Sequence, residues 1–149
     1  SLLSRMGAEV ELSNGTLTLK GNGVIIGIDV DLSEAGELTP TIAALAAIAS
    51  SPSRLTGIKH LRGHETDRIA ALATEINRIG SHAVELKDGL EITPGDLKPA
   101  RWLSYHDHRM ATAGAIVGLR IPGLEVENIQ TTSKTMPGFE NIWLRMLGS

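Results

Sequence analysis

The chain has 149 residues, a formal net charge of −3 and no cysteine. Its acidic balance and its single Phe and single Tyr argue against a nucleic-acid surface, which needs a basic face and stacking aromatic side chains. Without cysteine there are no disulfides or thiolate metal sites, which favours the reducing cytoplasm, and the apolar run Ile42 to Ala49 is far below the roughly 20 residues that span a membrane.

The first residues predict a helix that ends at Gly7, followed by a hairpin with strands over 10–12 and 16–19. Asn14-Gly15 is typical of a tight hairpin turn. The same order recurs from Arg78-Ile79-Gly80 onward, with strands over 84–86 and 90–93 and a turn expected at Asp88-Gly89. We interpret the two stretches as an internal repeat.

Between the hairpins, residues 26–31 and 54–58 predict strands. Thr39 as N-cap and Pro40 at the first helical position predict a helix to about residue 50, apolar on every side and therefore buried under several neighbours. Residues 66–79 predict a second helix. Its apolar stripe consists of Ile69, Leu72, Ala73, Ile76 and Ile79.

The pattern starts again near Trp102. Asp107 is expected to cap a helix over 108–119, a strand follows over 124–129, and Pro137 begins a last helix to 147. The predicted class is α/β, built from repeated βαβαββ units. Residues 1–24 would end one unit, 25–100 would form a full unit, and 101–149 would form most of a further unit.

Unusual polar residues recur just before or inside the first turn of these helices. They are Glu37, the run from His64 to Arg68, Asp107-His108-Arg109 and Lys134. A helix start carries about half a positive charge and unpaired N–H groups, so several of them aimed at one cleft attract anions. Cations at a helix start oppose the helix dipole, and a negative ligand explains them. The sequence therefore predicts a small polyanion as partner.

Each of these residues also has an ordinary interpretation. Glu65 and Arg68 could form a solvated first turn with a local ion pair, and Asp107 could be a simple N-cap. His106 and His108 lack the spacing of two metal ligands on one helix face, so we predict no metal site. Only the coincidence of the whole set points to an anion site.

Three segments resemble the signature segments of EPSP synthases: Leu61 to Arg68, Tyr105 to Ala111, and Lys134 to Pro137. His64 together with Gly36-Glu37-Leu38-Thr39-Pro40 is similar to the actinobacterial members. The resemblance covers nearly the whole chain. It implies two similar lobes, each of three βαβαββ units, with the active site between them. This chain would supply about two units of the C-terminal lobe.

The resemblance implies that the enolpyruvyl group of phosphoenolpyruvate moves to the 5-hydroxyl of shikimate 3-phosphate, releasing phosphate, in aromatic amino acid biosynthesis. No cofactor is expected. Glu37 would be the general base, and Glu65 would protonate and later deprotonate the methyl carbon. Arg68 and Arg109 would grip the phosphoenolpyruvate carboxylate, and Lys134 would lie at the transferred phosphate.

His64 and Glu37 would contact shikimate 3-phosphate, while Asp107 and His108 would orient the other groups, with His108 within reach of Glu65. Many family members have Asp in place of Glu37 and Lys in place of His64. Because the ordinary pKa of histidine is about 6.5, the His64 contact is expected to depend on pH.

Two alternatives stay open. One is a UDP-N-acetylglucosamine enolpyruvyl transferase, which shares the fold and the enol donor; the other is a non-catalytic anion- or RNA-binding module. The two segments that contain Arg68 and Arg109 favour shikimate 3-phosphate. We expect this piece to need the N-terminal lobe for activity.

Overall fold

The computed structural model describes residues 1–63 and 66–148. Helices, 3-10 helices (η) and strands follow in the order α1 (Leu2–Arg5), β1 (Glu9–Ser13), β2 (Thr16–Lys20), β3 (Asp29–Asp31), η1 (Gly36–Leu38), α2 (Thr39–Ala47), β4 (Ser53–Thr56), η2 (Lys59–Gly63), α3 (Arg68–Arg78), β5 (His82–Glu85), β6 (Leu90–Thr93), β7 (Arg101–Trp102), α4 (His108–Gly118), β8 (Glu125–Val126), η3 (Ile129–Lys134) and α5 (Phe139–Leu147). The predicted α/β class is confirmed.

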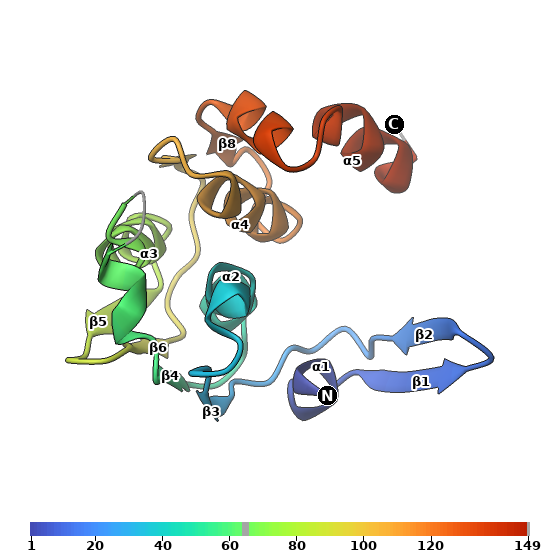
Figure 1. Cartoon of the computed structure of the whole chain (residues 1–149), viewed down its shortest axis with the longest axis horizontal. Helices are drawn as coiled ribbons and strands as arrows, with labels where there is room; N and C mark the ends of the chain where they lie inside the picture. The colour runs from blue at the N-terminus through green and yellow to red at the C-terminus, as the bar shows by residue number, and fades with distance from the viewer. Residues whose placement is uncertain (64–65, 149) are drawn as a thin grey trace.

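The main sheet has the strand order β3-β4-β6-β5 (Figure 1). Strand β3 runs parallel to β4, whereas the β4–β6 and β5–β6 pairs are antiparallel. Along the chain, β3, α2, β4, α3, β5 and β6 follow the predicted βαβαββ order. Strands β7 and β8 form a separate parallel pair that begins the next set of elements.

Helix α2 lies at the centre of the fold, packed against α3, α4 and the sheet (Figure 1). Ala43, Ala44 and Ala46 are completely buried, which confirms the prediction of a helix covered on every side. The apolar stripe predicted for α3 is buried as well. Within the described part of the chain, no helix is long and apolar enough to cross a membrane.

The two predicted hairpins turn in different ways. Asn14 and Gly15 both have positive φ angles, 50° and 76°, as the predicted tight turn requires, and the β1–β2 hairpin extends away from the other elements (Figure 1). The second hairpin closes through residues 86–89, where the N–H of Leu86 donates to the Gly89 carbonyl at 2.8 Å, so the predicted Asp88-Gly89 pair does lie in the turn. Gly89 also permits close packing: a Cβ there would lie 1.9 Å from the carbonyl oxygen of Leu55.

Strand β3 is shorter than predicted. The N–H groups of Gly27 and Ile28 donate to the hydroxyls of Ser51 and Ser53 instead of extending the ladder. Pro52, between these serines, has no N–H with which to continue the pairing. Side-chain hydroxyls thus replace the first part of the expected strand.

Two helix starts also differ from the prediction. Thr39 does not cap α2, because the 3-10 turn Gly36–Leu38 leads directly into the helix and makes Leu38 the N-cap residue. The Thr39 hydroxyl is buried and has no hydrogen-bond partner among residues 1–63 and 66–148. Helix α5 begins at Phe139, after Gly138 with a φ of 75°, and not at Pro137.

Candidate active site

The starts of three helices meet around one buried ion pair. Arg68 is the first residue of α3 and is only 3% exposed, while Asp107, the N-cap of α4, is completely buried. The Nε atom of Arg68 donates to Oδ2 of Asp107 at 2.7 Å, and Nη2 donates to Oδ1 at 3.4 Å. This two-point contact fixes the plane of the guanidinium. A solvated Arg68 is therefore ruled out.

Asp107 also organises the start of α4. Its Oδ1 accepts a hydrogen bond from the backbone N–H of Arg109 at 2.8 Å, which confirms the predicted N-cap. Burial alone would raise the pKa of Asp107, but the hydrogen bonds from Arg68 and from the Arg109 backbone outweigh it and hold the pKa below its ordinary value. Asp107 is thus ionised near neutral pH.

Glu37 joins the two arginines at the exposed edge of this cluster. Its Oε2 lies 3.2 Å from Nη1 of Arg68 and 2.5 Å from Nε of Arg109. The Nη1 atom of Arg109 also donates to the backbone carbonyl of Glu37 at 3.1 Å. The side chains of Glu37 and Arg109 are 51% and 37% exposed. The arginine pair, Arg68 and Arg109, therefore already holds one carboxylate at a surface that a ligand can reach.

Burial alone would lower the pKa of Arg68, but the hydrogen bond to Asp107 and the charges of Asp107 and Glu37 reverse this effect and raise the pKa. Arg68 is thus a permanent cation. Two cations and two carboxylates balance within the cluster, so an added anion would compete with Glu37 for the arginine pair.

A second ion network involves residues on both sides of positions 64 and 65. Asp67 caps α3 by accepting from the backbone N–H of Ala70 at 3.0 Å. Arg62 contacts Asp67 at 3.0 Å and Glu85 of β5 at 2.7 Å. The hydrogen bond to Glu85 is the largest influence that raises the pKa of Arg62. Both sides of the 64–65 segment are therefore attached to the folded body.

The structure brings together four of the predicted site residues: Glu37, Arg68, Asp107 and Arg109. His64 and Glu65 lie outside the described residues. The Nδ1 atom of His108 is buried and has no partner among the described residues.

Lys134 is the last residue of η3, which packs against α4. Its predicted place at a helix start is therefore wrong: α5 begins only at Phe139.

The sequence patterns predicted no role for Glu75 and Tyr105, which the structure brings together. Glu75 of α3 is completely buried, and its carboxylate accepts from the phenol of Tyr105 at 2.7 Å. The only sequence feature that could have indicated Glu75 was its spacing to Arg78, which suits a helical ion pair but is common on exposed helices.

Across residues 1–63 and 66–148, no three His, Asp or Glu side chains are grouped to hold a metal ion.

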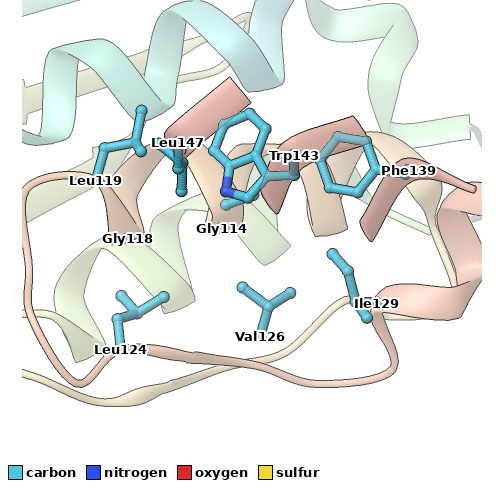
Figure 2. Close-up of a pocket in the computed structure, with 10 residues that line it drawn as sticks. Gly114, Gly118, Leu119, Leu124, Val126, Ile129, Phe139, Trp143 and Leu147 are labelled. Carbon is cyan, nitrogen blue, oxygen red and sulfur yellow. The ribbon is translucent and has the colours of Figure 1, made fainter. Parts of the chain in front are cut away.

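An apolar pocket of about 350 Å³ lies between α4 and α5 (Figure 2). Phe139 and Trp143 stack on one side of it, with ring centroids 5.3 Å apart. Gly114 and Gly118 line it from the second half of α4 and Leu119 from the C-cap of this helix, whereas Arg109 is in the first turn. None of the described residues that line the pocket is charged, so it does not suit a polyanion.

Comparison with known proteins shows a close relationship over the whole chain. A 3-phosphoshikimate 1-carboxyvinyltransferase of Kocuria rhizophila is 56% identical over 148 residues, which are 99% of this chain and 33% of that protein. The chain thus spans about a third of the length of this curated relative. Because Kocuria rhizophila is an actinobacterium, the expected likeness to actinobacterial members is confirmed.

Solved structures share the fold. An EPSP synthase from Acinetobacter baumannii matches with a TM-score of 0.81 and 26% identity, over 96% of this chain and 37% of that one. The enolpyruvyl transferase NikO from Streptomyces tendae matches with a TM-score of 0.73 over 97% of this chain and 33% of that one. At 17% identity, NikO supports the fold alone. The model of the EPSP synthase (3-phosphoshikimate 1-carboxyvinyltransferase) family matches residues 1–143, and the chain belongs to this family.

Proposed function

We propose that this chain forms part of the active site of a 3-phosphoshikimate 1-carboxyvinyltransferase. The reaction moves the enolpyruvyl group of phosphoenolpyruvate to the 5-hydroxyl of shikimate 3-phosphate and releases phosphate. The observation that carries the proposal is the arginine pair, whose two guanidinium groups converge on one exposed carboxylate. Planar guanidinium forks suit a planar carboxylate, and phosphoenolpyruvate offers one.

The substrate carboxylate would take over the contacts that Glu37 now makes with the arginine pair. Glu37, once released, would be available as the base for the attacking hydroxyl. The buried Asp107 would hold Arg68 in place during this exchange, because it contacts Arg68 at two points and stays ionised. The site would thus be organised before the substrate arrives.

The other assignments rest on the signature segments. Glu65 would protonate the methylene carbon and later remove a proton from the methyl group, and His64 would contact shikimate 3-phosphate. Lys134 would bind the transferred phosphate, and His108, whose buried Nδ1 lacks a described partner, would orient Glu65. An N-terminal lobe would supply the opposite wall.

A UDP-N-acetylglucosamine enolpyruvyl transferase is the nearest rival. The match to the EPSP synthase family model and the 56% identity to the Kocuria rhizophila relative favour shikimate 3-phosphate as the acceptor. The same two comparisons disfavour a non-catalytic anion- or RNA-binding module.

A chimaera tests the proposal: this chain replaces the matching segment of the Kocuria rhizophila relative. We expect Glu65→Gln in the chimaera to lower kcat about 10²- to 10⁴-fold, the usual contribution of an acid–base group, while KM values change little. Glu91→Gln, which alters an exposed glutamate of β6, is the matched control. Phosphate release measures turnover, and near-normal kcat for Glu65→Gln would remove this residue from the mechanism.

A further inference from the structure

Asp107 follows two residues in an unfavourable backbone conformation. Tyr105 and His106 have φ angles of 54° and 55°, in the left-handed region that residues with a Cβ rarely adopt. Such conformations persist only where surrounding contacts enforce them. The segment from Leu103 to His106 must therefore be held by interactions stronger than its own preference. Because it leads directly into Asp107, its position decides where α4 begins.

Glu75 supplies these contacts from α3. Its Oε1 accepts from the phenol of Tyr105 at 2.7 Å, and its Oε2 accepts from the backbone N–H of Leu103 at 3.1 Å. Arg78 donates to the same carboxylate from Nε at 2.9 Å and from Nη2 at 3.3 Å. One completely buried carboxylate thus holds both ends of the segment from Leu103 to Tyr105.

Arg68 and Glu75 are on the same helix, seven positions and two turns apart, so they share one face. Arg68 holds Asp107, and Glu75 holds the residues just before it. Helix α3 therefore holds the chain that enters α4 by hydrogen bonds at two separate points. These two attachments oppose a rotation or sliding of α4, which would move Arg109 away from Arg68.

The phenol of Tyr105 is suited to a permanent donor role. Burial, together with the hydrogen bond to Glu75, raises the pKa of Tyr105 to about 12. The O–H group therefore remains protonated at every pH at which a protein of this kind works. A hydroxyl that never ionises is suited to positioning and not to proton transfer.

We propose that Glu75 and Tyr105 are positioning residues that set the distance and angle between Arg68 and Arg109 by holding the strained backbone ahead of Asp107. Neither touches the arginine pair directly in the contacts described. They act through the Leu103–His106 segment, and their importance for substrate binding rests on the proposed function.

The test begins with the 149-residue chain itself. The ¹H–¹⁵N signal of the Arg68 Nε–H group reports its hydrogen bond to Asp107. We expect Tyr105→Phe, which removes only the hydroxyl, to shift this signal. Ser81→Ala is the matched control, because it removes another buried hydroxyl, which donates to the Ala47 carbonyl at 2.6 Å. An Arg68 signal that stays in place in Tyr105→Phe, or that moves equally in Ser81→Ala, overturns the proposal whatever reaction the protein catalyses.

A second substitution tests whether backbone strain at positive φ is what the Tyr105–Glu75 hydrogen bond opposes. Glycine adopts positive φ freely, so adding His106→Gly to Tyr105→Phe should return the Arg68 signal toward its original position. A double variant that behaves like Tyr105→Phe alone would contradict the claim that the Tyr105–Glu75 bond opposes backbone strain.

Kinetics in the chimaera then connect positioning to binding. We expect Tyr105→Phe to raise KM for phosphoenolpyruvate about threefold to tenfold, the scale of one hydrogen bond, with KM for shikimate 3-phosphate unchanged. A shifted Arg68 signal with unchanged KM for phosphoenolpyruvate would keep the positioning role and reject the carboxylate-binding role of the arginine pair. An unshifted signal would reject the positioning role.

Discussion

At the scale of single residues, the Arg68–Asp107 pair is the most consequential contact of the site. Both partners are buried, so neutralising Asp107 would leave the buried Arg68 cation with the half-exposed Glu37 as its counter-ion. We expect Asp107→Asn to lower the free energy of unfolding by about 3–5 kcal/mol, as for other broken buried pairs. Urea denaturation at pH 7 measures this. Asp96→Asn, at an exposed aspartate, is the control and should change stability by less than about 0.5 kcal/mol.

The Arg68–Asp107 pair also predicts that the free energy of unfolding depends on pH. Because the pKa of Asp107 is lowered in the folded state, its stabilising contribution is fully present above the unfolded-chain pKa of about 3.9. The contribution is lost as the pH falls through the lower, folded-state pKa. The stability difference between the wild type and Asp107→Asn should therefore shrink below about pH 4. A difference that stays constant into acid would show that the charge of Asp107 does not stabilise the fold.

At the scale of secondary-structure elements, glycine is needed in the two hairpins for different reasons. Gly15 has positive φ and open space around it, whereas Gly89 has no positive φ and contacts the backbone of β4. Asparagine tolerates positive φ, so Gly15→Asn should cost less than about 1 kcal/mol. Gly89→Asn should cost about 3 kcal/mol or more, because its Cβ would overlap the Leu55 carbonyl. Denaturation of the two variants compares them directly, and equal costs would contradict this assignment.

The elements also show where sequence patterns succeed. The apolar stripe of α3 and the Asp107 cap of α4 were predictable because periodicity and capping are local properties. The role of Gly89 was not, because it depends on β4, more than thirty residues earlier in the chain.

The candidate site, too, was only partly predictable from the sequence. The sequence indicated Arg68 and Arg109 through their unusual positions at helix starts. It gave no sign that Glu75 is buried, because that depends on the chain between β7 and α4 folding back onto α3. The bridging of both arginines by Glu37 likewise joins three helix starts that are far apart in sequence.

At the scale of the whole molecule, the chain spans about a third of its Kocuria rhizophila relative. Leu12, Leu17 and Leu19 of the first hairpin are largely exposed. We expect the isolated chain to release no appreciable phosphate from phosphoenolpyruvate and shikimate 3-phosphate, because in the proposed site an N-terminal lobe supplies the opposite wall and its cations. The chimaera is the positive control. Robust turnover by the isolated chain would refute the proposal that it carries only part of the site.

The proposed binding of the phosphoenolpyruvate carboxylate by Arg68 and Arg109 is tested most directly by substrate-specific kinetics. Arg109→Lys in the chimaera keeps the charge but removes the planar fork. We predict that KM for phosphoenolpyruvate rises about 10- to 100-fold, the scale of a charge-assisted hydrogen bond, while KM for shikimate 3-phosphate stays the same. Arg101→Lys, at an exposed arginine of β7, should change neither value. An unchanged KM for phosphoenolpyruvate in Arg109→Lys, or an equal rise for both substrates, would contradict the account.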